Sequence, residues 1–166
     1  MKKKILIIIL IGTILQVMLI HSLTLHKLYT RTSNVTLSEL EKQQIRENTT
    51  NLTEEQIIQY CIRHTAQKLT FSKHNQLSKG KANCVGYSSL GCAVLNYAFT
   101  VHNIKNKATH VVGYVYCGEI NLNKILMLIY PNTGFVKDHD FIELNDCYID
   151  PCIYDYLGNS CKTSKR

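Results

Sequence analysis

Residues 85–99 are apolar on nearly every side of the helix that their composition favours. A helix without a polar face needs neighbours all round, so we expect it at the centre of its domain. Gly86 and Gly91 lower the helix propensity of this run, and we attribute them to close packing against a neighbouring element. The helix is expected to begin at Asn83 or Cys84 and to end near Phe99. Any fold of this chain must be built around it.

The remaining pattern places helices first and strands later. Thr53 and Gln56 have the spacing of a capping box, and apolar residues follow at helical intervals, which predicts a helix over 54–69. A loop is expected at 71–81 and a turn at 103–107. Strands are expected at 110–117, 124–130, 135–144 and 147–150, with a turn at 131–134. Because helices and strands do not alternate, the order favours an α+β fold with an antiparallel sheet.

The N-terminus has the features of a targeting segment. Three lysines in residues 1–4 precede an uncharged, apolar run over residues 5–20. A signal peptide and an uncleaved signal anchor both fit, and a buried helix of a cytosolic protein is a third interpretation. No small-x-small cleavage site follows, so we favour the anchor. In either exported form the lysines stay inside, and the chain is membrane-anchored outside the cytoplasm or secreted.

These patterns divide the chain into four parts. Residues 1–26 are expected to be the signal anchor or signal peptide, and residues 27–52, rich in Thr, Ser, Asn, Glu and Gln, a polar linker or a frayed helix. Residues 53–160 are expected to form the folded domain, which is long enough for one core. Residues 161–166 are expected to be a basic tail.

The net charge does not indicate a nucleic-acid partner. The chain carries 19 Lys and Arg, and a formal net charge of +7. Six of these basic residues belong to the targeting segment and the tail. The rest of the chain then has 13 Lys and Arg against 12 Asp and Glu, so it is nearly neutral. No basic stripe with interleaved aromatic residues is found, so nucleic-acid binding is excluded as a function.

The seven cysteines point to an exported protein with one free thiol. Disulfides persist outside the cytoplasm, so we expect Cys84 to stay unpaired and at least one other pair to be bridged, up to three bridges in all. A bridge between Cys152 and Cys161 would close a short loop, although the pairing is open and some cysteines can be core residues. The chain has no CxxC and no paired Cys/His spacing, so we expect no metal and no cofactor.

A histidine and an aspartate are predicted to meet on the last two strands. If residues 145–146 form a two-residue hairpin loop, Phe141 pairs with Asp150. His139 lies two residues before Phe141 on the same face, which makes it a diagonal neighbour of Asp150. The sequence therefore predicts a hydrogen bond between His139 and Asp150.

Together with Cys84 these residues form a candidate catalytic triad. A helix N-terminus and a neighbouring imidazolium favour a thiolate, and a carboxylate fixes the tautomer of the imidazole. The backbone N–H of Cys84 is a candidate oxyanion donor. Each residue also has a structural interpretation, as core cysteine, surface histidine or turn aspartate. His110 is a rival to His139, but we expect it to lack an acidic partner at strand or hairpin distance.

The stretch over residues 80–155 resembles the transglutaminase-like core, a branch of the papain-like cysteine enzymes. The motifs that carry the resemblance are Cys84 at the start of the central helix, His110-Val111-Val112-Gly113-Tyr114-Val115, His139-Asp140-Phe141-Ile142-Glu143, and Asp150-Pro151. The resemblance implies Cys84 as nucleophile, His139 as general base and acid, and Asp150 as its orienting partner. Two positions depart from the family pattern: Phe141 stands where Trp is common, and Val85 where an aromatic residue often follows the cysteine.

The resemblance implies an acyl transferase or hydrolase that acts on an amide bond of a protein or peptide through a thioester of Cys84. The acceptor is water or an amine, and the similarity to small bacterial peptidases and amidases favours water. Two other functions stay open. One is an inactive binding or scaffold domain of the same fold, and the other is a thiol–disulfide exchanger, which the absence of CxxC disfavours.

Overall fold

The structure is a computed structural model that describes residues 23–129, 137–145, 147–157 and 163–164. Its sheet has six strands and only antiparallel pairs. The strands are β1 (Leu23–Thr30), β4 (Ala108–Cys117), β6 (His139–Leu144), β7 (Cys147–Ile149) and β8 (Thr163–Ser164) in the order β1-β4-β6-β7-β8, with β5 (Ile120–Asn121) paired to β4. The expected α+β class with an antiparallel sheet is confirmed.

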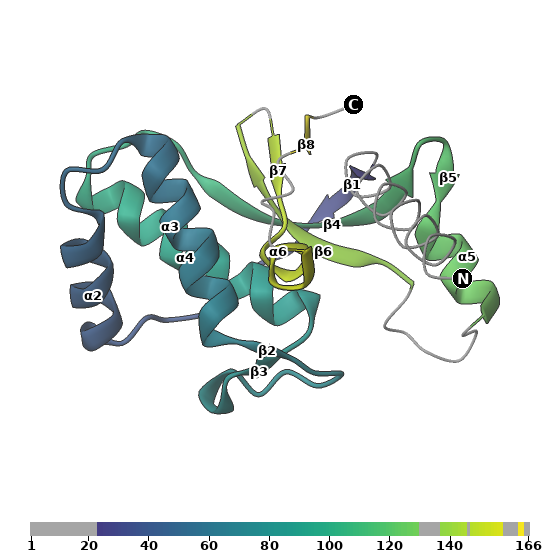
Figure 1. The fold of residues 1–166 in the computed structure, drawn as a ribbon, viewed down its shortest axis with the longest axis horizontal. Helices are drawn as coiled ribbons and strands as arrows, with labels where there is room; N and C mark the ends of the chain where they lie inside the picture. The colour runs from purple at the N-terminus through teal and green to yellow at the C-terminus, as the bar shows by residue number, and fades with distance from the viewer. Residues whose placement is uncertain (1–22, 130–136, 146, 158–162, 165–166) are drawn as a thin grey trace, which may run out of the picture.

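The helices gather mainly at one end of the sheet. They are α2 (Glu39–Thr49), α3 (Glu54–Lys68), α4 (Cys84–Val101), α5 (Leu122–Ile129) and α6 (Pro151–Leu157). A small parallel pair, β2 (Thr70–Phe71) with β3 (Lys81–Ala82), encloses the 3₁₀ turn η1 (Leu77–Lys79). In Figure 1, α2, α3 and α4 lie at one end of the long strand β4, and β5 and α5 lie at its other end.

Helix α4 is the centre of the domain, as its composition predicts. It packs against α3, α6 and β6, and Tyr87, Val94, Leu95, Ala98 and Phe99 are at most 1% exposed. Among the described residues, α4 is long and apolar enough to cross a membrane, but 61% of it is buried inside the domain. Its apolar character is that of a core helix.

The two glycines of α4 are positions of close approach. A Cβ atom at Gly86 would lie 2.6 Å from the Ala82 Cβ and from the Asn75 Oδ1. One at Gly91 would lie 2.7 Å from the Cδ1 of Ile142 on β6. Since real Cβ atoms do not come this close to their neighbours, any larger residue would push the sheet or the preceding loop away from α4.

The helix starts follow from capping residues. Thr53 forms the predicted capping box, in which its N–H donates to Gln56 Oε1 over 2.9 Å. Ser38 forms a second box with Glu41 at the start of α2. Asn83 is the N-cap of α4, and its Oδ1 accepts from the N–H of Val85 over 3.1 Å.

Of the two interpretations of residues 27–52, the polar linker is wrong, and the helix is present but packed on the domain. The first residues of this stretch complete β1, which pairs with β4 from Leu23 to Thr30. Its later residues form α2, which packs on α4 and buries Ile45 completely. A strand at the sheet edge and a helix with one buried face need few apolar residues, so their composition resembles that of a linker. The domain therefore begins at β1, within the part expected to be the anchor; residues 1–22 of that part lie outside the described residues.

Two other expected elements are wrong as well. Residues 124–130, expected as a strand, belong to α5 up to Ile129. Short apolar runs fit both states; here Leu and Met favour the helix, and Asn121 caps it by accepting from the Lys124 N–H over 3.0 Å. In the expected tail, Thr163 and Ser164 pair with β7 as β8. The strands expected at 110–117 and 147–150 are present as β4 and β7, and the strand expected at 135–144 is described from His139 on.

Gly113 tests how firmly β1 belongs to the domain. A Cβ atom there would collide with the carbonyl group of His26 on β1 and with the Phe141 ring. We expect Gly113→Ala to lower the free energy of unfolding by roughly 1–3 kcal/mol, measured by chemical denaturation. Leu28→Ala, a truncation of a half-exposed β1 residue, should change it by less than about 0.5 kcal/mol. Equal stability of the two variants would contradict the tight β1–β4 pairing.

Candidate active site

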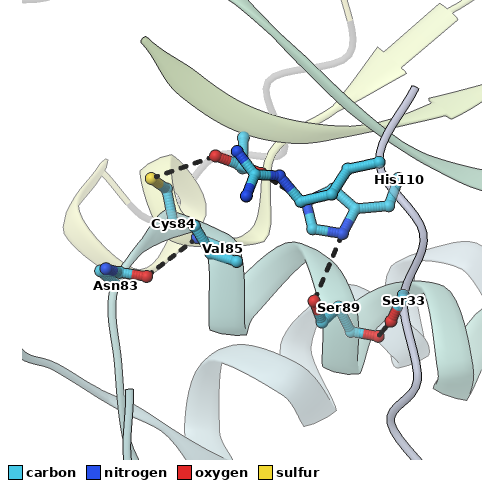
Figure 2. Close-up of polar contacts among 8 residues, drawn as sticks. Ser33, Asn83, Cys84, Val85, Ser89 and His110 are labelled. Atoms are coloured by element: carbon cyan, nitrogen blue, oxygen red, sulfur yellow. Dashed lines mark hydrogen bonds and ion pairs between the residues drawn. The ribbon is translucent and has the colours of Figure 1, made fainter. Parts of the chain in front are cut away.

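Cys84 is the first residue of α4 and lies at the end of a fixed loop. The N–H of Asn83, its predecessor, donates to Asn75 Oδ1 over 2.9 Å. The Asn83 side chain in turn accepts from Val85 (Figure 2). The N–H of Cys84 itself, in the first helical turn, has no intrahelical acceptor. Cys84 is only 6% exposed. Because it is the first residue of α4, its thiol lies near the backbone N–H groups of the first helical turn.

His139 and Asp150 are in hydrogen-bonding contact, as the hairpin argument predicts. The observed register pairs Leu144 with Cys147 and Ile142 with Ile149, which is the register of a two-residue loop. Asp150 is fully buried. Its second oxygen, Oδ1, accepts from the N–H groups of Cys152 and Ile153 over 2.9 and 3.0 Å. The carboxylate therefore begins α6 and fixes the imidazole at the same time.

The imidazole of His139 links Asp150 to Cys84. Burial alone would lower the pKa of His139, but the charge and hydrogen bond of Asp150, with a further hydrogen bond and charge from Cys84, raise it well above its usual value. The side chain is 15% exposed, and its ring stacks on Phe141 with 6.3 Å between centroids. Of the three residues predicted from the sequence, His139 and Asp150 are thus in direct contact, and Cys84 lies close enough to influence the imidazole.

A second His–Asp pair also lies beside Cys84. His110 Nε2 is 2.6 Å from Asp140 Oδ1, and Arg31 Nε is 2.8 Å from the same oxygen. The other oxygen, Oδ2, is 4.0 Å from Cys84 Sγ (Figure 2). The opposite ring nitrogen of His110, Nδ1, is 3.3 Å from Ser89 Oγ. Asp140 is 1% exposed, so an anionic group is buried directly beside the thiol.

The expectation that His110 lacks an acidic partner is therefore wrong. His110 pairs with Ile142 on β6, so Asp140 is its diagonal neighbour. The same diagonal relation, across β6 and β7, predicts the contact of His139 with Asp150. Arg31 had no sequence signal, because it lies in the stretch expected to be a linker.

A cavity of about 300 Å³ opens beside the thiol. Its described lining residues, besides Cys84, are Lys73, His74, Asn83, Val85, Asp138 and Asp140. Two basic side chains come from the loop between β2 and η1, and two carboxylates from the start of β6. Phe, Tyr and Trp are absent from the described lining, and Phe141 is buried against Tyr148 behind the site. The lining combines charged side chains of both signs with a larger share of apolar surface, so it suits a substrate that has polar and apolar parts.

The described cysteines correct the disulfide expectation. Cys84 is a free thiol, as expected, but Cys61, Cys92 and Cys152 are free as well. The expected Cys152–Cys161 bridge is therefore wrong, and three bridges are impossible; Cys161 lies outside the described residues. The three other free cysteines are buried core residues. Burial raises the pKa of the Cys61 and Cys92 thiols to about 12, so they are far less reactive than an exposed thiol.

Comparisons with known proteins add no family to this geometry. The chain matches no protein-family model, no curated protein and no solved structure. Within the described residues, His, Cys, Asp and Glu form no group of three that would hold a metal ion. The resemblance to the transglutaminase-like core therefore rests on the residues quoted for it and stays a prediction.

The two carboxylates flanking Cys84 should have opposite effects on its thiol. Asp140→Asn removes a negative charge 4.0 Å from Sγ, which favours the thiolate, so alkylation at pH 6 should become about threefold faster or more. Asp150→Asn should slow it, because the imidazolium that stabilises the thiolate loses its partner. The rate is measured by mass mapping of Cys84 after timed iodoacetamide exposure.

Cys61 and Cys92 are internal controls in that experiment, because they stay protected in any variant that remains folded. A change of the same sign in Asp140→Asn and Asp150→Asn would contradict the separate roles of the two carboxylates.

His139 should make stability depend on pH. A histidine whose pKa is raised in the folded state binds its proton more tightly there than in the unfolded chain. Its contribution to the stability of the fold is therefore complete at pH values below the pKa of an unfolded histidine, about 6.5. The contribution is lost as the pH rises through the higher pKa of the folded state. Urea denaturation between pH 6 and 9 should show stability falling with pH, and His139→Gln should flatten this slope. His26→Gln, on the exposed β1, should keep it; an unchanged slope in His139→Gln would refute the assignment.

Proposed function

We propose that this protein is a cysteine-dependent hydrolase or acyl transferase of transglutaminase-like fold that acts on an amide bond of a protein or peptide. The observation that carries the proposal is the contact between His139 and the buried Asp150, with Cys84, at the start of α4, close enough to raise the pKa of that imidazole. A thiol, an imidazole and a carboxylate in this order supply a nucleophile, its acid–base partner and a group that fixes the imidazole tautomer.

The proposed reaction proceeds in two steps. The Cys84 sulfur attacks the amide carbonyl carbon, and the N–H of Cys84 stabilises the oxyanion. The protonated His139 gives its proton to the leaving amine, the C–N bond breaks, and a thioester forms. His139 then takes a proton from water or an amine as that acceptor attacks the thioester, and the Cys84 thiolate leaves. Asp150 stays ionised and holds the imidazole throughout.

Water is the acceptor that we favour. Small bacterial members of the transglutaminase-like superfamily, which this chain resembles, look more often like peptidases or amidases than cross-linkers, and the charged side chains in the cavity lining provide groups that hydrogen-bond water. Lys73 and His74 on one side and Asp138 on the other give the cavity both charge signs.

One observation favours the alternative of an inactive binding or scaffold domain. Asp140 lies within 4.0 Å of the sulfur, and a buried carboxylate opposes a thiolate beside it. Arg31 and His110 offset this charge from the same side. We propose that the offset leaves Cys84 able to ionise when His139 is protonated.

We further propose that the domain is exported and attached to the membrane by residues 5–20 as an uncleaved anchor. Only His21 and Ser22 separate this apolar run from β1. Cleavage by a signal peptidase would need an extended, accessible segment in this gap, and two residues leave little room for it. The short connection supports the anchor over the cleaved signal peptide.

Mass spectrometry tests the proposed activity. The full chain is incubated with a peptide mixture, with and without a fluorescent primary amine, and products and any thioester at Cys84 are identified. Cleaved amides support hydrolysis, and amine incorporation supports transfer. We expect Cys84→Ala and Cys84→Ser to lose nearly all turnover and Asp150→Asn to lose roughly 10²–10⁴-fold.

His26→Gln is the matched control for His139→Gln, and it should keep full turnover. Turnover that survives Cys84→Ala undiminished, or the absence of any acylated Cys84 over a broad peptide set, would leave the scaffold function in place of the enzyme.

A further inference from the structure

Helix α5 presents an apolar face to the outside of the domain. Leu128 is 83% exposed and Ile129 60%, and Ile125 is 42% exposed. Asn123 lies on the opposite face of the helix, where its Oδ1 accepts from the Val115 N–H of β4 over 2.7 Å. This bond fixes which side of α5 faces the sheet, so Ile125, Leu128 and Ile129 are on the outer side. Leu126 and Met127, nearer the sheet, are 39% and 40% exposed, so the helix leaves much apolar surface uncovered.

The start of β1 brings the N-terminal segment to the same corner of the fold. Leu23, the first residue of β1, pairs with Cys117 at the end of β4, and Cys117 also pairs with Ile120 of β5. Neighbouring strands are about 4.8 Å apart, so Leu23 and Ile120 are separated by about 10 Å. Ile120 is itself 55% exposed, and α5 begins two residues later.

The apolar run over residues 5–20 ends three peptide steps before Leu23. Three steps span at most about 11 Å, even when fully extended. If this run crosses the membrane, the corner that holds β5 and α5 is therefore held within about 20 Å of the end of the run. A domain on a long linker could turn any face to the membrane, but this one has no such linker.

We propose that the apolar face of α5, formed by Ile125, Leu128 and Ile129, lies in the lipid interface and fixes the orientation of the domain on the membrane. The proposal rests on the anchor put forward above and not on the catalytic activity. A short helix with an apolar outer face and a lysine, here Lys124, at its margin has the features of an interfacial helix. In Figure 1, α5 lies at the opposite end of the molecule from α2, so only one end of the domain would meet lipid.

A fluorescence experiment tests this, because the chain contains no tryptophan. Leu128→Trp places a single reporter on α5, and Leu40→Trp places a matched one on α2, where Leu40 is 66% exposed. Each full-length variant is reconstituted into phosphatidylcholine/phosphatidylglycerol vesicles with and without brominated acyl chains. We expect Leu128→Trp to emit at shorter wavelength and to lose at least about half its intensity with brominated lipid, and Leu40→Trp to be unaffected.

Each other outcome overturns the proposal. Equal quenching of the two reporters means that α5 is not the membrane face. A blue-shifted but unquenched Leu128→Trp means that α5 is covered by protein, such as a second copy. Failure of the chain to float with the vesicles means that there is no anchor. None of these readouts needs activity, and repeating the experiment with Cys84→Ala separates the orientation of the domain from the failure or success of the proposed enzyme.

Discussion

The Asp150 carboxylate is the group on which the arrangement around the site depends. A fully buried carboxylate is costly unless hydrogen bonds replace its water, and here both oxygens are used. One contacts His139 on β6, and the other accepts from the two amide groups that begin α6. The β6–β7 hairpin, the start of α6 and the orientation of the imidazole are therefore determined together. A change at this residue would disturb packing and the candidate chemistry at once, which is why the nearly isosteric Asn is the informative substitution.

Cys84 is placed between two carboxylates that act on it in opposite directions. Asp150 acts through His139 and stabilises a positive charge next to the sulfur, whereas Asp140 faces the sulfur directly. Successive residues of β6, His139 and Asp140, point to opposite faces of the strand, yet both reach the thiol because it sits at the strand's beginning. The balance between these two contacts sets the fraction of thiolate, so the difference between an active enzyme and an inactive relative of the same fold can lie in Asp140 and its partners Arg31 and His110.

The sequence predicts the structure correctly where a single local rule determines the geometry. The two-residue hairpin fixed the register between β6 and β7, and with it the contact between His139 and Asp150. The composition of α4 fixed its central position, and Thr53 fixed the start of α3. The prediction fails where polar or ambiguous segments gain their structure from distant contacts. Strand β1 forms because β4 offers it an edge. Arg31 reaches Asp140 only because that strand is there, and no local pattern of residues 27–52 indicates it.

Strand β4 relates the candidate site to the proposed membrane face. Its Gly113 pairs with His139, and its Cys117 pairs with Leu23, where the chain enters from the N-terminal segment. Four residues along an antiparallel strand span about 14 Å, so the imidazole lies at roughly this distance, measured along the strand, from the point of entry. If residues 5–20 are the proposed anchor and α5 lies in the interface, only two residues separate β1 from that anchor, which limits how far the domain could carry Cys84 from the bilayer. The substrates best placed to meet the thiol are then amides of proteins or peptides held close to the same membrane surface, and freely diffusing ones have no comparable advantage.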